Sequence, residues 1–248
     1  MYKVLANMLS NRLKDVMDSI NGETQMAFIK NNQILDSFVI AKEIIQLWKK
    51  DNNSGLHVKV DFEKAYDSVD HGFLDSMMRD MDFSLRWRQW MKNCIATPML
   101  SVLVNGSHTS QFGKERVLHQ GNLISPFLFN IVTESLSSVL RKAIDLGLIS
   151  GATFGNNEVY ISHLQFADDM IIFLKSRLEY LCKARRILRC FELVMGLRIN
   201  FHKSYVVKID KKKTTEDGWA DAFKSKKATL PITYLCLPLG ARPNTKSF

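Results

Sequence analysis

The feature that most constrains this chain is a pair of acidic residues, Asp168 and Asp169, set inside an otherwise apolar stretch. Apolar residues stand on both sides of the pair: Ile161, Leu164, Phe166 and 170–174. Short runs rich in β-branched and aromatic residues are typical of strands. Aspartate tolerates the backbone of a tight turn. We therefore predict a buried hairpin with two carboxylates at its tip.

A second apolar run ends in another carboxylate, Asp61, directly after Val58, Lys59 and Val60. Carboxylate oxygens are hard ligands that suit Mg²⁺ or Mn²⁺. Three carboxylates on two adjacent strands can hold two divalent ions over a phosphate. A single such residue is more often a turn or a helix cap. The combination favours Asp61, Asp168 and Asp169 as metal ligands and catalytic residues.

Composition limits the class of protein. The chain has 248 residues, of which 46% are hydrophobic, enough for one large domain or two small ones. Its formal net charge of +9 suits a polyanionic partner such as nucleic acid. No apolar run reaches the ~18 residues of a membrane span, and residues 1–13 lack an apolar signal core. The four cysteines lie far apart in the sequence and form no Cys-x-x-Cys pair, which is typical of reduced thiols in a reducing compartment. We expect an intracellular protein without a membrane partner.

The acidic motifs resemble those of reverse transcriptases, specifically of plant LINE-type non-LTR retrotransposons. The resemblance covers a fingers segment and five palm motifs in the family's order: 25–29 with 33–36, then 61–67, 120–130, 166–169, 196–204 and 234–240. It implies an α+β fold, with a polymerase-type palm sheet, flanking helices and partial fingers. Residues 1–56 would be the partial fingers, and 57–248 the palm with intervening fingers elements. No thumb and no upstream endonuclease are expected within this sequence.

Local patterns place the other elements. Apolar residues at helical spacing predict helices over 2–20, 34–48 and 178–194. Asp70 and Ser84 are expected to begin two short helices, and Ser125 to cap a long one. Asn105-Gly106 predicts a hairpin. The predicted buried faces of the two longest later helices include Val139, Leu178 and Val194.

The resemblance implies RNA-directed DNA synthesis with Mg²⁺ or Mn²⁺, an RNA template, a DNA primer and dNTP substrates. It also assigns residues to the nucleotide site: Lys30, Tyr66, Gln120, Gly121 and Lys203. It assigns others to the primer grip: Tyr234, Leu235, Leu237 and Gly240. An aromatic at position 66 would block the 2′-hydroxyl of a ribonucleotide; packing against the palm is the alternative. Lys203 would protonate the leaving pyrophosphate. Retrotransposon ancestry implies the nucleus, and protein partners are unknown.

Several residues depart from the family pattern. Asn32 replaces an arginine that would bind the triphosphate, and Lys30 is the candidate substitute. Other departures are Val117, His119, Asn122, Leu123, Met170 and Cys236. Two alternatives to an active polymerase therefore stay open: a nucleic-acid-binding remnant without chemistry, and an inert relic. Lys183, Arg185, Arg186 and Arg189 share one helix side, either as a solvated face or as phosphate ligands.

Overall fold

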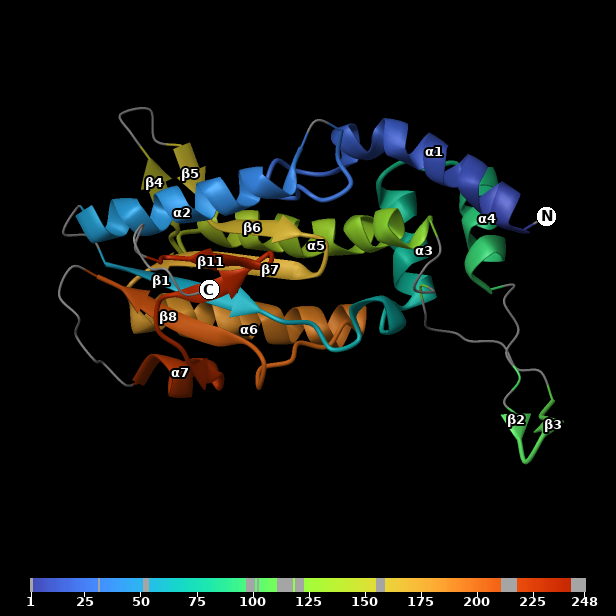
Figure 1. The fold of residues 1–248 in the computed structure, drawn as a ribbon. Helices are drawn as coiled ribbons and strands as arrows, with labels where there is room; N and C mark the ends of the chain where they lie inside the picture. The colour runs from blue at the N-terminus through green and yellow to red at the C-terminus, as the bar shows by residue number, and fades with distance from the viewer. Residues whose placement is uncertain are drawn as a thin grey trace.

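The computed structural model describes residues 2–30, 32–50, 54–96, 101, 103–110, 118, 123–154, 159–210 and 218–241. Its centre is a five-stranded sheet with the order β6-β7-β1-β8-β9 (Figure 1). All neighbouring strands are antiparallel except β8 and β9. The strands are β1 (Gly55–Val60), β6 (His163–Phe166), β7 (Asp169–Lys175), β8 (Tyr205–Ile209) and β9 (Lys226–Lys227).

Helices and small hairpins surround this sheet, which confirms the expected α+β fold. The helices are α1 (Tyr2–Ile20), α2 (Ile34–Lys50), the 3-10 turn η1 (Ala65–Asp67), α3 (His71–Asp80), α4 (Leu85–Ala96), α5 (Ser125–Asp145), α6 (Leu178–Met195) and α7 (Gly218–Phe223). The hairpins pair β2 (Leu103–Val104) with β3 (Ser107–His108), β4 (Ala152–Phe154) with β5 (Val159–Ile161), and β10 (Ile232–Tyr234) with β11 (Leu237–Leu239).

Both faces of the sheet are buried. Alternate residues of each strand point to opposite faces, and a separate hydrophobic core covers each face. Figure 1 shows α5 and α6 behind the sheet and the β10–β11 hairpin in front of it. Leu56, Val58 and Val60 of β1 belong to the core shared with α5 and α6. Phe173 and Val207 belong to the opposite core, shared with α2 and the hairpin. This explains why β7 reads as a continuous apolar run.

Helix α5 is buried around most of its circumference, including polar residues such as Asn130 and Glu134. Ser125 was predicted to cap this helix, but it is the first helical residue, and the cap position is Ile124. Val139 was predicted to be buried but is exposed. The helix ends near Gly147, whose positive φ of 66° is easy only for glycine. As a central helix, α5 can position residues on both sides of it.

Helices α1 and α6 each bury a single stripe. In α1 the buried residues Leu9, Leu13 and Met17 follow a four-residue spacing, and α1 packs on α5. Leu178 and Val194 of α6 were predicted to be buried, but both are exposed. Leu178 is the first residue of the helix, and Val194 lies one position off the buried stripe of Leu181, Ala184, Leu188, Phe191 and Met195.

Both predicted short helices occur. The Oδ1 atom of Asp70 accepts a 2.9 Å hydrogen bond from the backbone N–H of Phe73 and so caps α3. The Ser84 hydroxyl accepts a bond from the Trp87 N–H at the start of α4. Asn105 and Gly106 form the turn between β2 and β3. None of the helices in the described ranges is long and apolar enough to cross a membrane.

The segment between α1 and α2 is fixed to the edge of the sheet. The Gln165 N–H donates to the Thr24 carbonyl, and the Met26 N–H donates to the Gln165 carbonyl. The Asn130 side chain of α5 donates to the Ala27 carbonyl at 2.7 Å. His163 is fully buried and bonds through its Nε2 to the Thr24 hydroxyl. These contacts hold the segment 22–27 beside strand β6, whose hairpin carries Asp168.

Candidate active site

The acidic hairpin forms as the sequence predicted. Strands β6 and β7 pair up to Phe166 and Asp169, which leaves Ala167 and Asp168 as a two-residue loop. Ala167 has a positive φ of 54°, as the first position of such a loop requires. Asp168 therefore lies in the turn itself, whereas Asp169 is the first residue of β7. The two neighbouring carboxylates consequently occupy different backbone environments.

Asp61 lies beside this hairpin because β1 and β7 are adjacent. Their register pairs Val60 with Met170, so the next position places Asp61 opposite Asp169. The backbone of Asp61 is held on its other side by the chain before β8. Its N–H donates to the Ser204 hydroxyl at 3.0 Å, and its carbonyl accepts from the Asn200 N–H at 2.7 Å. The fold thus brings three predicted catalytic residues to one end of the sheet.

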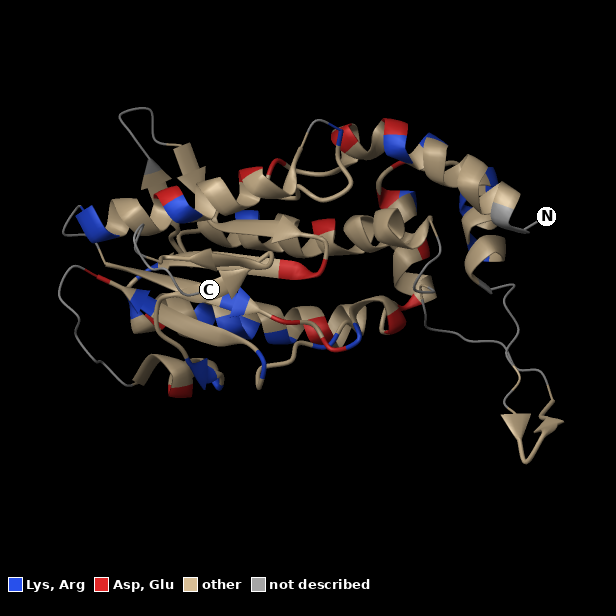
Figure 2. Ribbon diagram, in the orientation of Figure 1, with Lys and Arg blue, Asp and Glu red and all other residues tan. Residues whose placement is uncertain are grey.

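The electrostatics of this end are dominated by negative charge and partial burial. Burial raises the pKa of the Asp168 carboxyl, and the nearby charges of Asp169 and Asp61 raise it further. Lys59 opposes this effect, and its Nζ lies 3.0 Å from Asp169 Oδ1. Figure 2 shows the acidic segment where β7 begins and a basic segment near the end of β1. Asp169 is therefore already paired with a cationic side chain of the protein.

The residues present suit a divalent ion by their chemistry, since all three side chains offer carboxylate oxygens. Their place at adjacent strand ends also suits an ion shared between strands. Within the described residues, however, no three Asp, Glu, His or Cys side chains already form a cluster that could hold a metal ion. The site therefore has the donors, but its side chains would have to move together to bind metal. Asp169 would also have to exchange its lysine partner.

The position of Tyr66 is compatible with both of its predicted roles, which are packing against the protein and blocking the 2′-hydroxyl of a ribonucleotide. Its ring packs on Phe129 of α5, with ring centroids 4.8 Å apart. Burial raises the pKa of its phenol to about 12, and the charge of Asp168 adds to the shift. The ring is thus fixed against α5 while its phenol lies within the electrostatic field of the candidate site. Its backbone carbonyl also accepts a bond from Leu118, close in sequence to the predicted Gln120-Gly121 motif.

The other predicted nucleotide-binding residues are distributed unevenly. Gln120 and Gly121 lie outside the described residues. The side chain of Lys30 is exposed, and its backbone N–H donates to Asp18 of α1. Asn32 is exposed as well. Lys203 is exposed in the turn that leads into β8. Lys203 lies close to the Asp61 segment, because it lines one pocket together with Phe62 and Glu63. Among the described residues, Lys30 makes no contact with the three carboxylates.

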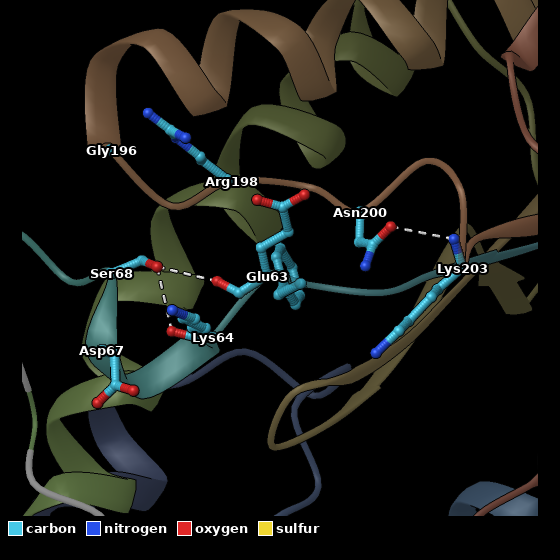
Figure 3. A pocket seen from close by; sticks show the side chains of 9 residues that line it. Glu63, Lys64, Asp67, Ser68, Gly196, Arg198, Asn200 and Lys203 are labelled. Atoms are coloured by element: carbon cyan, nitrogen blue, oxygen red, sulfur yellow. Dashed lines mark hydrogen bonds between the residues drawn. The ribbon is translucent and has the colours of Figure 1, made fainter.

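An open pocket with a volume of about 490 Å³ lies beside the Asp61 segment. Figure 3 shows its side chains coming from two stretches of chain, one following β1 and one preceding β8. Lys64, Arg198 and Lys203 line it, together with the carboxylates of Glu63 and Asp67. Lys64 has a positive φ of 46°, and the Ser68 hydroxyl donates to the carbonyls of Glu63 and Lys64. The pocket is therefore polar and of mixed charge.

The predicted primer-grip residues form the β10–β11 hairpin. Tyr234 is fully buried, and burial raises the pKa of its phenol well above the usual range. Leu235 and Cys236 make the turn, and both have positive φ, at 49° and 63°. Leu237 begins β11, and Gly240 follows it with a φ of 81°. Burial of Tyr234 and Leu239 packs the hairpin on the sheet face that carries Phe173.

The basic side of α6 is largely engaged within the protein. Lys183 pairs with Glu179, and Arg189 pairs with Glu192 while lying over the Phe201 ring at 4.3 Å. Arg185 donates to the Ala222 carbonyl of α7. Arg186 is exposed. These contacts favour the solvated-face interpretation of this helix over phosphate binding.

Sequence reasoning gave no role to Lys59 or Ser204. Lys59 stands two residues before Asp61, and strand alternation places such residues on one face. That alternation was the available signal for Lys59. Ser204 lies more than 140 positions from Asp61 and contacts it only through the tertiary fold. No local pattern indicates such a bond.

Residues 1–239 match the family model described as reverse transcriptase (RNA-dependent DNA polymerase). The chain is 24% identical over 203 residues to the Transposon TX1 uncharacterized 149 kDa protein of Xenopus laevis, covering 82% of this chain and 15% of that protein. It is 26% identical over 210 residues to the Pol polyprotein of retrotransposable element R2DM of Drosophila melanogaster, covering 84% and 19%. The chain thus spans less than a fifth of these two relatives.

A shorter match has higher identity. Over 70 residues the chain is 40% identical to the uncharacterized mitochondrial protein AtMg01250 of Arabidopsis thaliana, covering 28% of this chain and 57% of that protein. Among solved structures, telomerase from Candida tropicalis with a fragment of telomeric RNA superposes with a TM-score of 0.61 at 15% identity. That match covers 98% of this chain and 37% of the telomerase chain. At this identity the likeness concerns the fold.

Proposed function

Because the chain belongs to the reverse transcriptase (RNA-dependent DNA polymerase) family, we propose that it performs template-directed nucleotidyl transfer at the end of β1 and β7. The observation that carries this proposal is the register that sets Asp61 opposite Asp169, with Asp168 in the adjoining turn. Phosphoryl transfer depends mainly on positioning and on charge stabilisation. Three carboxylates at one end of the sheet would supply the metal ligands that positioning and charge stabilisation require.

Asp61, Asp168 and Asp169 would hold the divalent ions, Mg²⁺ or Mn²⁺. When bound, such ions lower the pKa of the primer 3′-hydroxyl and neutralise the leaving pyrophosphate. The backbone bonds from Asp61 to Ser204 and Asn200 support this role, since they fix where its side chain begins. Tyr66, rigid against Phe129, would limit the space beside the sugar of the incoming nucleotide.

The substrates that fit this proposal are an RNA template, a DNA primer and dNTPs. Lys203 would contact the triphosphate and protonate the leaving group, and its position near the Asp61 segment supports this role. Lys30 would supply the charge that Asn32 lacks. The β10–β11 hairpin, with Tyr234, Leu235, Leu237 and Gly240, would support the primer end. Residues 1–56 would act as partial fingers and 57–248 as palm.

We further infer a plant LINE-type origin. The ordered motifs and the 40% identity to a segment of an Arabidopsis protein support it. That origin would place the protein in the nucleus, which microscopy of the tagged full chain tests.

A binding remnant without chemistry is the second candidate. The exposed Asn32, in place of the family's arginine, is the observation that favours it. Such a remnant would bind primer–template with an affinity that falls steeply as salt rises, because Lys and Arg contacts release counterions. The polymerase would show the same salt dependence together with synthesis. Binding without synthesis therefore separates the two.

The direct test is primer extension on an RNA template with dNTPs and Mg²⁺, using the purified chain. The proposal expects extension that stops when the metal is chelated and that follows the template sequence. A folded chain that binds the duplex, yet adds no nucleotide in Mg²⁺ or Mn²⁺, would overturn the enzyme and leave the remnant. A chain that binds no duplex even at low salt would overturn both.

A further inference from the structure

Lys59 forms an ion pair with one carboxylate of the candidate metal site. Its Nζ lies 3.0 Å from Asp169 Oδ1, and its side chain is only 21% exposed. In the sheet register Lys59 is opposite Ile171, so Asp169 is its diagonal neighbour on the next strand. Long side chains reach such diagonal neighbours on one face of a sheet. The ion pair therefore follows from the strand register and is not an accident of an exposed side chain.

The buried surroundings of Asp169 increase the importance of its ion pair with Lys59. The same face carries Tyr205 opposite Lys59 on β8, and His57 and Phe173 farther along β1 and β7, all buried or half-buried. The charge of Asp169 is felt by Tyr205, where burial and then this charge raise the phenol pKa to about 12. An acidic cluster against such a surface is costly without a counter-charge. Lys59 supplies that counter-charge when no metal ion is bound.

A divalent ion would need the same carboxylate. The side chain of Asp169 is 37% exposed, so an ion from solvent can reach its carboxylate. No three acidic, His or Cys side chains in the described ranges are already gathered around a metal position. The ion pair with Lys59 and a divalent ion shared with the other carboxylates would therefore both use the oxygens of Asp169.

We propose that Lys59 is a built-in competitor of the divalent ion, which neutralises Asp169 in the metal-free protein and is displaced when metal binds. This inference rests on the proposed function, since it requires that the carboxylates bind metal. Lys59 acts on the metal site through Asp169, the carboxylate with which it pairs. It holds the acidic cluster together without metal and weakens metal binding by the same interaction. Replacing it should therefore shift metal affinity and metal-free stability in opposite directions.

The test is a titration of Mn²⁺ into the full chain without nucleic acid, following the spectral signal of free Mn²⁺ by electron paramagnetic resonance. Lys59→Met keeps the length of the side chain and removes its charge. Lys175→Met is the matched control, because it removes the same charge from the other end of β7, about 20 Å away along the strand. Unfolding temperatures in a chelator are measured on the same samples.

We expect Lys59→Met to bind Mn²⁺ at least about fivefold more tightly than the wild type, and Lys175→Met to stay within about twofold. Lys59→Met should also unfold at a lower temperature in the chelator. The affinity gain should vanish in an Asp169→Asn background, because the competition acts through that carboxylate. Unchanged or weaker Mn²⁺ binding by folded Lys59→Met, beside a wild type that binds, overturns the Lys59 inference alone. No Mn²⁺ binding by any variant overturns the metal-dependent function as well.

Discussion

The backbone N–H of Asp61 donates a 3.0 Å hydrogen bond to the hydroxyl of Ser204, a fully buried side chain. The same hydroxyl donates to the Asn200 carbonyl at 2.8 Å, while the Asn200 N–H donates to the carbonyl of Asp61. Three residues thus form a closed set of bonds around the backbone of one candidate catalytic residue. Strand β1 delivers Asp61, and the turn before β8 fixes it.

Ser204→Ala should lower both stability and nucleotide addition. The variant leaves the Asp61 N–H without its acceptor, which costs about 1–3 kcal/mol for a fully buried group and less for this partly buried one. A displaced carboxylate should reduce kcat by about tenfold or more with little change in the KM for dNTP. Ser204→Thr keeps the hydroxyl and should restore most of both. Equal rates for Ser204→Ala and the wild type would show that the bond does not position Asp61.

Stability should fall in mild acid because two histidines are buried in neutral form. Burial lowers the pKa of both His57 and His163 to about 3 from an ordinary value of 6.5. The unfolded chain takes up both protons below pH 6.5, and the folded chain does so only near pH 3. Their stabilising effect is therefore complete above pH 6.5 and lost as pH falls from 6.5 toward 3. Each contributes a slope of about 1.4 kcal/mol per pH unit.

Urea unfolding at pH 7, 6, 5 and 4.5 measures this slope. His57→Leu, which replaces a ring between Phe173 and Tyr205 with an apolar side chain, should reduce the slope by the share of one histidine. His163 is hydrogen-bonded to Thr24 and Ser162, so its own variant would disturb more than the titration. An identical pH slope in the wild type and in His57→Leu would contradict the assignment.

Cys236→Gly should stabilise the chain by about 1 kcal/mol. Leu235 and Cys236 both adopt positive φ in the β10–β11 turn, where a residue with a Cβ is strained and glycine is not. Cys236→Ala removes the thiol but keeps the Cβ, and should leave the free energy of unfolding nearly unchanged. Both are measured by chemical unfolding under reducing conditions. Equal stabilities of the Gly and Ala variants would show that backbone strain is not relieved at this turn.

Tyr66→Ala should relax the choice between deoxyribonucleotides and ribonucleotides. The ring is fixed by Phe129, so removing it opens space that a 2′-hydroxyl could enter. We expect discrimination against rNTPs to fall by at least about tenfold, a typical effect of pocket size on specificity. Tyr66→Phe keeps the ring and should keep the discrimination. The ratio of kcat/KM for dNTP and rNTP is the quantity to compare, and an unchanged ratio in Tyr66→Ala would leave only the packing role.

Local patterns predicted the parts of the fold that depend on local physics. The hairpin at Asp168 follows from two apolar runs around a turn, and the Asp70 cap follows from a residue type at a helix start. The wrong predictions concern residues whose burial or helix position depends on tertiary packing. Val194 lies one position off the buried stripe of α6, which continues to Met195, and Ser125 is the first residue of α5 rather than its cap. Neither position is distinguishable from its neighbours without the tertiary structure.

The candidate site shows the same division. Asp61, Asp168 and Asp169 were identified from their type and flanking strands, but their proximity depends on the pairing of β1 with β7. The ion pair of Lys59 follows from that register, which a sequence does not contain. The contact of Ser204 with Asp61 joins distant segments and needed the folded chain. Residue type and flanking strands therefore predicted the carboxylates, and the fold shows the bond that holds Asp61 and the ion pair that neutralises Asp169.

The measurement that tests the central claim most directly is single-turnover addition of one deoxynucleotide to a primer on an RNA template in Mg²⁺. It compares the wild type with Asp168→Asn and with Asp67→Asn. Asp67 is the matched control, because it is an exposed carboxylate six residues after Asp61 that faces the neighbouring pocket. We predict that Asp168→Asn loses at least about a thousandfold in rate, while Asp67→Asn stays within about threefold. Equal rates for Asp168→Asn and the wild type would contradict the claim that these carboxylates form the active site.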